Sequence, residues 1–277
     1  MRHELRLFFI ALQFLTRIPV PAWVGFDAAW LNQSVRHFPL AGACVGLFGA
    51  LVFALGLALF PPVVAVLLSM IATVWLTGAF HEDGLADTCD GLGAAVSRER
   101  SLEIMKDSRI GTYGVCGLVL VLGVKAAALI ELAQLHPVLA CLALVWGHAA
   151  SRTAPVWLMW ATPYAGDTEQ ARAKPLAAQV RGSDVVVALL WTGLLTVAVW
   201  LVAAWFDLRV DEVDLIAWGL IAASIGIAVT TLLAARWLRK RLGGFTGDTL
   251  GAVQQVTELV SLLAWLAVAH ALAGSHG

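Results

Sequence analysis

The sequence predicts an all-α protein, a polytopic membrane helix bundle of about seven transmembrane helices preceded by an N-terminal amphipathic helix. Two observations predict this class. Of the 277 residues, 60% are hydrophobic and only 13% are charged, whereas soluble domains are about half apolar and about a quarter charged. The apolar residues also gather into runs close to the roughly 20 residues that a helix needs to cross a bilayer. We expect one integral membrane domain over residues 1–277.

The first element is predicted at about residues 5–18, in the stretch LRLFFIALQFLTRIPVP. Its apolar part is short, is interrupted by Arg6 and Gln13, and ends at Arg17 and two prolines. This pattern favours an amphipathic helix that lies at the membrane interface over one that crosses the bilayer. A secretory signal peptide is the alternative, but no small-x-small cleavage site follows the apolar core.

Seven apolar runs follow, each close to membrane-spanning length. Prolines border several of them, where the missing backbone N–H costs least. Pro155 lies inside a run and predicts a kink near the end of that helix. The runs are Pro39–Phe60, Val63–Phe80, Val115–Gln134, Val138–Trp160, Val185–Phe206, Leu215–Ala235 and Val253–Ala273.

Basic residues determine the predicted orientation. If the N-terminal helix stays at the inner surface, nearly all Lys and Arg residues fall on loops that face the cytoplasm, as the positive-inside rule requires. The connections on the opposite side are short. We therefore expect the functional segments on the cytoplasmic face, in loops at about residues 81–114, 163–184 and 236–252.

The stretch FHEDGLADTCDG carries the most informative spacing. If the preceding helix continues through it, Asp83, Asp87 and Asp90 fall within an arc of about 60°. Neighbouring ionised carboxylates about 6 Å apart repel by roughly 3 kcal/mol at an effective dielectric of 20, so a cation or protonation must relieve them. Hard oxygen ligands suit Mg²⁺ or Mn²⁺ rather than zinc. The alternative is a solvated acidic cap, which needs no common face. Glu82 lies off this face and has no assigned role.

A basic turn follows in RERSLEIMKDSRIGTYG. Lys106 and Arg109 are candidate phosphate-binding cations, and Gly111 opens the next helix, whose free N–H groups favour anions. Carboxylate-bound Mg²⁺ beside such groups is typical of phosphate chemistry. For Arg98 and Arg100, anchoring at lipid headgroups explains the charge equally well.

The third element is the glycine-rich GGFTGDTLGAVQQ, just before the last run. It lacks the Lys of a Walker A loop, so it is no ordinary nucleotide P-loop. Around Thr246 its backbone could hold a phosphate, and Asp248 is either a metal ligand or a helix cap.

Ionisable residues inside the runs should face the bundle interior, because lipid exposure is costly. His148 and Arg152 are four residues apart on one helical face, and Lys125 lies in the middle of another run. They either reach the acidic residues or a ligand, or pair with each other for stability.

The blocks FHEDGLADTCDGLGAA and RERSLEIMKDSRIGTYG together resemble the signature of the cobalamin synthase (adenosylcobinamide-GDP ribazoletransferase) family. FLTRIPVP, HFPLAGACVG and GGFTGDTLGAVQQVTELV resemble other blocks of that family in the same order, so the likeness covers most of the chain. It implies a Mg²⁺-dependent inner-membrane phosphotransferase that joins adenosylcobinamide-GDP to α-ribazole or its 5′-phosphate. The products would be adenosylcobalamin, or its phosphate, and GMP.

The resemblance and the spacing together give the expected site. The expected metal ligands are Asp83, Asp87, Asp90 and Asp248. The expected proton-transfer residues are His81, Asp87 and Asp90. The expected substrate-binding residues are Lys106, Asp107, Ser108, Arg109, Gly111, Arg152 and Thr246.

Two other functions remain as alternatives. A CDP-alcohol phosphatidyltransferase also uses aspartates at helical spacing, but its pattern wants Ala-Arg where this chain has Ala86 and Asp87. A divalent cation transporter should carry its acidic residues near the bilayer midplane, often in repeated halves, and no repeat is evident. No basic arm suggests a nucleic-acid partner. The sequence leaves open whether the chain forms homo-oligomers or associates with other cobalamin-assembly enzymes.

Overall fold

The computed structural model describes residues 2–25, 27–166, 180–205 and 210–274. The described residues form helices and no strand, apart from an isolated bridge between Tyr164 and Phe245, so the predicted all-α class is confirmed. Most of the predicted loop at 163–184 lies outside the described residues. In chain order the elements are α1 (Arg2–Leu15), η1 (Ala22–Val24), α2 (Ala28–Ser34), η2 (Val35–His37), α3 (Phe38–Leu57), α4 (Pro62–Thr77), α5 (Phe80–Gly93), α6 (Arg98–Ile104), α7 (Thr112–Leu135), α8 (Pro137–Ser151), α9 (Thr153–Ala161), α11 (Gly182–Trp205), α12 (Val210–Leu242) and α13 (Gly247–Gly274).

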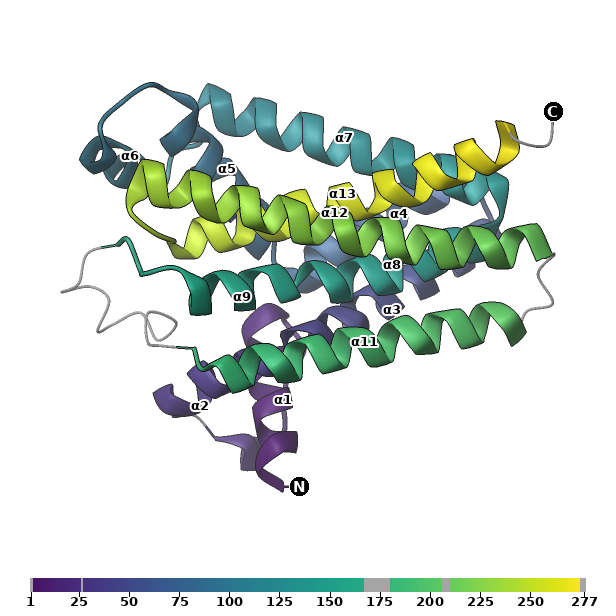
Figure 1. The fold of residues 1–277 in the computed structure, drawn as a ribbon, viewed down its shortest axis with the longest axis horizontal. Helices are drawn as coiled ribbons and strands as arrows, with labels where there is room; N and C mark the ends of the chain where they lie inside the picture. The colour runs from purple at the N-terminus through teal and green to yellow at the C-terminus, as the bar shows by residue number, and fades with distance from the viewer. Residues whose placement is uncertain (1, 26, 167–179, 206–209, 275–277) are drawn as a thin grey trace.

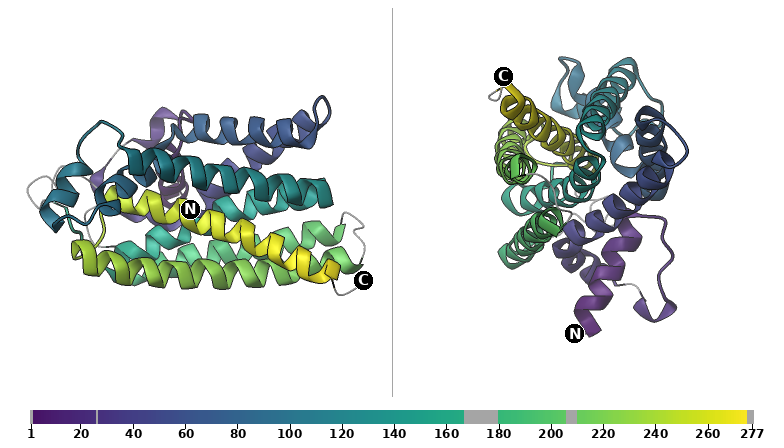
Figure 2. Two further views of the ribbon diagram at one scale, coloured as in Figure 1. Left: turned by 90° about the horizontal axis from the view of Figure 1, so that it is seen from above. Right: turned by 90° about the vertical axis from the view of Figure 1, so that its right-hand side faces the viewer.

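The long helices form one bundle. Figure 1 and the two views of Figure 2 show α7, α11, α12 and α13 running along the long axis, with α1 crossing it. A single apolar core extends through most of the elements. With 14 residues, α1 is about 21 Å long, too short to span a bilayer. The predicted N-terminal helix is therefore confirmed as a helix of less than spanning length.

Five helical segments in the described part are long and apolar enough to cross a membrane, or six if α4 and α5 together count as one span. Seven were expected. The expected Val63–Phe80 reaches spanning length only if α4 and α5 are taken together, and the expected Val138–Trp160 is not among these segments. That run is divided at Arg152 into α8 and α9. The cause is Pro155, whose ring clashes with the carbonyl of the residue four positions earlier, Ser151, where α8 ends. The helix is therefore interrupted at Arg152, close to the predicted kink.

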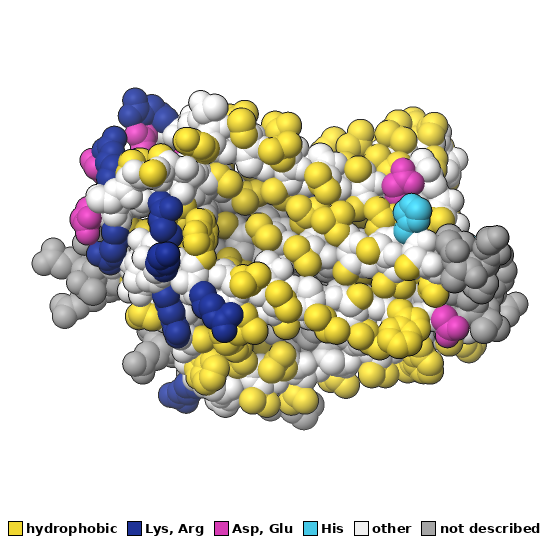
Figure 3. Space-filling view, turned by 45° about the horizontal axis from the view of Figure 1, so that its top comes forward, with side chains coloured by type: hydrophobic (Ala, Val, Ile, Leu, Met, Phe, Trp, Pro, Cys, Tyr) yellow, Lys and Arg dark blue, Asp and Glu magenta, His cyan; other side chains and the backbone are white. Residues whose placement is uncertain are grey.

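Charged side chains gather at one end of the bundle, which we call the basic end. Figure 3 shows the Lys and Arg side chains there, while the sides of the molecule are mainly hydrophobic. It includes α6, the turn after it and the last turn of α12, which carries Arg239, Lys240 and Arg241. The predicted functional loops at about 81–114 and 236–252 therefore lie at the same end of the bundle.

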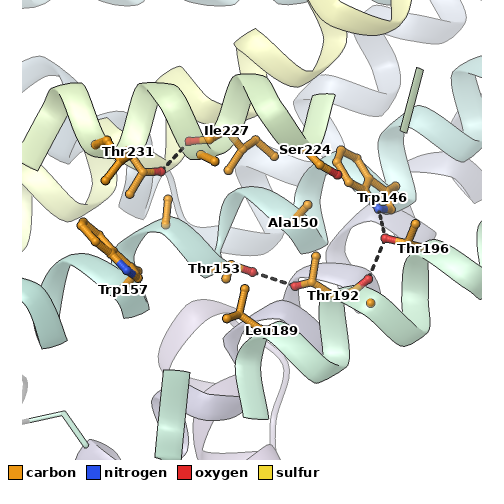
Figure 4. Close-up of a pocket in the computed structure, with 14 residues that line it drawn as sticks. Trp146, Ala150, Thr153, Trp157, Leu189, Thr192, Thr196, Ser224, Ile227 and Thr231 are labelled. Atoms are coloured by element: carbon orange, nitrogen blue, oxygen red, sulfur yellow. Dashed lines mark hydrogen bonds between the residues drawn. The ribbon is translucent and has the colours of Figure 1, made fainter. Parts of the chain in front are cut away.

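Helix α11 is joined to the α8–α9 pair by side-chain hydrogen bonds (Figure 4). The Trp146 indole Nε1 donates to the Thr196 hydroxyl at 2.8 Å, and the hydroxyls of Thr153 and Thr192 lie 2.7 Å apart. Between these helices and α12 lies a cavity of about 410 Å³ lined mainly by apolar groups. These contacts fix α11 although most of its surface is exposed to the bilayer.

Candidate functional site

A sharp bend places α5 at the basic end. Gly78 and Ala79 both adopt the left-handed conformation, with φ of 67° and 58°, and α5 turns 88° away from α4. The expectation that the preceding span continues through the acidic stretch is therefore wrong. A non-glycine residue in this conformation costs roughly 1–2 kcal/mol, so the surrounding contacts must hold the bend.

The aspartates nonetheless share a face of a helix. α5 is helical from Phe80 to Gly93, so the spacing of four and three residues places Asp83, Asp87 and Asp90 along one stripe. Asp83 is exposed, and Asp87 and Asp90 are half-buried. Asp83 is therefore open to solvent, whereas Asp90, at the other end of the stripe, is partly covered by protein.

Asp90 is bound to the beginning of α7. Its Oδ2 accepts a hydrogen bond from the Gly111 N–H at 2.7 Å, and its Oδ1 accepts one from the Gly114 N–H at 2.9 Å. A side chain at either glycine would collide with this carboxylate. Asp90 thus satisfies N–H groups that a helix start leaves without partners, and it fixes α7 against α5.

Asp248 approaches α5 from the other side. A Cβ atom at Gly84 would lie 2.6 Å from the backbone oxygen of Asp248, so only glycine permits this approach. Thr246 and Thr249 cap α13 reciprocally: the Thr246 N–H donates to the Thr249 hydroxyl at 2.8 Å, and the Thr249 N–H donates to the Thr246 hydroxyl at 3.2 Å. Threonines therefore make this cap, and Asp248 occupies the first turn of α13 beside α5.

Together Asp83, Asp87, Asp90 and Asp248 form a group that we call the acidic cluster. Burial and the negative charges of Asp83, Asp248 and Asp90 raise the pKa of Asp87 from 3.8 to about 6. The ionised form of Asp87 is thus disfavoured by burial and by the carboxyl groups around it. The cluster is therefore electrostatically suited to a cation.

The donor set fits Mg²⁺ in a limited way. Among the described residues, no three His, Cys, Asp or Glu side chains converge as ligands of one metal ion, and both oxygens of Asp90 already accept hydrogen bonds. Mg²⁺, however, is commonly held by one or two carboxylates together with water and substrate phosphates. Asp83 and Asp87, with Asp248 beside them, meet that smaller requirement.

The predicted phosphate-binding turn lies beside α7. Lys106, Ser108 and Arg109 are exposed. The Arg109 guanidinium donates to both oxygens of Asp107, at 3.0 and 2.7 Å, and lowers the pKa of that carboxyl to about 2. Asp107 thus orients Arg109, and the turn presents cations at the surface.

His81 and Arg152 do not join the acidic cluster. His81 is buried, and burial together with the charge of Arg152 lowers its pKa well below 6.5. Arg152 is 2% exposed and donates to the backbone oxygen of His148 at 2.7 Å. His81 is on α5 but about 160° around the helix axis from Asp83. Both His81 and Arg152 lie in the bundle interior, away from the face that carries Asp83 and Asp87.

Sequence reasoning missed the polar groups on the buried side of α5. Glu82, which was given no role, is buried, and its Oε1 accepts a hydrogen bond from the Gln255 amide at 2.9 Å. The sequence did contain a signal for such a group: Glu258 lies inside one predicted span and Lys125 inside another, so the two opposite charges could pair within the bundle. We call the connected group the buried polar chain; it comprises Glu82, Lys125, His148, Ser151, Gln254, Gln255 and Glu258.

Comparison with known proteins covers nearly the whole chain. A family model described as cobalamin-5-phosphate synthase matches residues 7–266. A protein of Leptothrix cholodnii named adenosylcobinamide-GDP ribazoletransferase is 56% identical over 265 residues, 96% of each chain. Proteins with the same name from Shewanella amazonensis and Vibrio cholerae are 43% and 42% identical, over 96% of this chain and 96% and 95% of their own. No solved structure matches the chain.

Proposed function

Because the chain belongs to the cobalamin-5-phosphate synthase family, we propose that the acidic cluster is the place where it joins adenosylcobinamide-GDP to ribazole. The names of its relatives support the reaction, and the matched range contains every residue of the cluster. The observation that carries the location is the shared face of Asp83 and Asp87 on α5 with Asp248 beside it, where burial and the neighbouring carboxyls raise the pKa of Asp87. Diphosphate chemistry at carboxylates needs a cation.

The reaction is a phosphoryl transfer. A hydroxyl of the ribazole acceptor forms an O–P bond to the phosphorus on the corrinoid side of the diphosphate, the P–O bond to the departing GMP breaks, and the hydroxyl loses its proton. Asp83 and Asp87 would hold Mg²⁺, with Asp248 as a further ligand. A bound Mg²⁺ offsets charge on the diphosphate oxygens.

Backbone and basic groups around the cluster support diphosphate binding. The first turns of α7 and α13 both begin beside α5, and the positive ends of two helix dipoles favour anions there. Lys106 and Arg109 stand at the surface of the adjoining turn, where they can contact the GMP phosphate. His81 is poorly placed to accept the proton of the hydroxyl, because it is on the buried face of α5, away from Asp83 and Asp87. A carboxylate of the cluster is the better acceptor.

The finer assignments follow the same reasoning. The acceptor is α-ribazole or its 5′-phosphate, and the basic turn has cations for the additional phosphate. The enzyme lies in the inner membrane with the basic end in the cytoplasm, because the Lys and Arg side chains gather at that end (Figure 3).

GMP release from adenosylcobinamide-GDP and α-ribazole tests the proposal. Purified wild type should release GMP only with Mg²⁺. Asp87→Asn should lose at least a hundredfold in rate, because it weakens a ligand of the metal that offsets diphosphate charge. Asp27→Asn is the matched control: it makes the same substitution at the exposed N-cap of α2, where Asn caps equally well. Full activity of Asp87→Asn, or full activity without a divalent ion, would contradict the proposal.

A further inference from the structure

The buried polar chain connects α5 to three other helices. Lys125 on α7 forms an ion pair with Glu258 on α13 at 2.7 Å, and His148 on α8 contacts the same carboxyl at 3.2 Å. Gln255, one turn before Glu258, reaches Glu82 on α5. These five residues are between 2% and 8% exposed. Polar side chains this deep are expensive unless they bond one another.

Lys125 fixes the orientation of the Gln255 amide. Its ammonium donates to Gln255 Oε1 at 3.2 Å, so the amide oxygen must face the lysine. The amide nitrogen then faces Glu82 and donates to Oε1 at 2.9 Å. An amide has one accepting and one donating end, so this arrangement links a cation on α7 to a carboxyl on α5 through a side chain of α13.

The charges in this region balance. Glu82 and Glu258 provide two carboxyl groups, Lys125 provides one cation, and Arg152 lies within electrostatic reach of both carboxyls. A cation in transit needs an excess of negative charge, which this group of side chains does not provide. The buried polar chain is therefore suited to joining helices, not to carrying ions.

Helix α5 is held on both sides of Asp83. Glu82 and Gly84 are its immediate neighbours, about 100° to either side around the helix axis. Glu82 is held by Gln255, and Gly84 packs on the backbone of Asp248. Both partners lie on α13, so the rotation of α5 about its own axis depends on α13.

We propose that Gln255, oriented by Lys125, which Glu258 holds in turn, is a positioning residue that sets the rotation of α5 and thereby the direction in which Asp83 and Asp87 project. This inference rests on the proposed function, since it gives the buried polar chain a role in assembling that site. Gln255 touches no reacting atom and acts through Glu82.

The matched pair Gln255→Leu and Gln254→Leu tests the proposal. Both glutamines are at most 2% exposed, but Gln254 donates to Ser151 and Glu258, at 2.9 and 2.6 Å, and not to α5. Each purified variant is placed in lipid nanodiscs. Mn²⁺ affinity is measured by electron paramagnetic resonance, and amide hydrogen exchange is measured for peptides covering residues 80–93.

Gln255→Leu should weaken Mn²⁺ binding at least tenfold, the size of effect seen when a group that orients a metal ligand is removed. It should also speed exchange in α5. Gln254→Leu should leave both quantities within twofold of wild type even where its melting temperature falls. If Gln255→Leu does not fold, Glu82→Gln and Glu82→Met provide the comparison: the first keeps an oxygen for the Gln255 amide and should retain Mn²⁺ affinity, whereas the second should not.

The outcomes separate the two proposals. Equal exchange in α5 and equal Mn²⁺ affinity for the two leucine variants would overturn the positioning role. Absence of Mn²⁺ binding by the wild type would overturn the proposed metal site, and the exchange comparison would still decide whether Gln255 holds α5.

Discussion

Asp87→Asn should stabilise the metal-free protein while removing its response to Mg²⁺. Burial and the neighbouring carboxyls raise the pKa of Asp87 from 3.8 to about 6, so the folded protein disfavours the ionised form at neutral pH. Each pKa unit is worth about 1.4 kcal/mol, which sets an upper limit of roughly 3 kcal/mol. Asp87 is only half-buried, so solvent screening reduces the expected gain to about 1 kcal/mol.

The pH dependence of this stability gain provides a second test of its sign. Because the folded protein binds this proton more tightly than the unfolded chain does, the penalty of an ionised Asp87 is complete above about pH 6 and disappears below the unfolded pKa of 3.8. The advantage of Asn should therefore shrink as pH falls from 7 toward 4.

Thermal unfolding in detergent micelles, with EDTA or with Mg²⁺, measures both effects. In EDTA at pH 7.5, Asp87→Asn should melt about 2–4 °C above wild type, the shift that about 1 kcal/mol produces in a chain of this size. Mg²⁺ should raise the melting temperature of wild type and not of the variant. A variant that melts below wild type in EDTA and keeps the full Mg²⁺ response would refute the reasoning.

Three further changes separate the roles of the residues around α5. Gly84→Ala should cost about 1–3 kcal/mol of stability and most of the GMP release, because the new methyl meets the Asp248 backbone. Gly193→Ala is the control: it lies in open space and should stabilise α11 by up to about 1 kcal/mol in thermal unfolding. Equal effects of the two substitutions would contradict the close packing of Gly84 on Asp248. Asp90→Ala should cost about 0.5–2 kcal/mol through the lost cap of α7, so a gain in stability like that of Asp87→Asn would contradict the capping role. Arg109→Ala should raise the KM for adenosylcobinamide-GDP about tenfold with an unchanged melting temperature, and an unchanged KM would remove this residue from the substrate site.

Much of the fold and part of the candidate site could be predicted from the sequence. Seven spans were predicted, and the described residues contain five or six segments long and apolar enough to cross a membrane. The run around Pro155 is divided into α8 and α9, and α4 reaches spanning length only with α5; a run of apolar residues does not reveal where a helix breaks. The acidic spacing correctly indicated one helical face, because periodicity within a single helix is a local property. The bend before α5 was missed because Ala79 adopts the left-handed conformation that sequence rules expect of glycine.

The sequence by itself determined the membrane class of the chain, its family and the common face of Asp83, Asp87 and Asp90. Composition is sufficient for the membrane class, residue spacing for the common face, and the resemblance of the sequence blocks for the family. Only the tertiary structure decided that Asp90 caps α7, that His81 is on the buried face of α5, and that Glu82, 173 residues before Gln255, is bonded to it. Contacts over such separations depend on how whole helices pack, because hydrogen bonds inside a membrane are set by the partners that packing brings within reach.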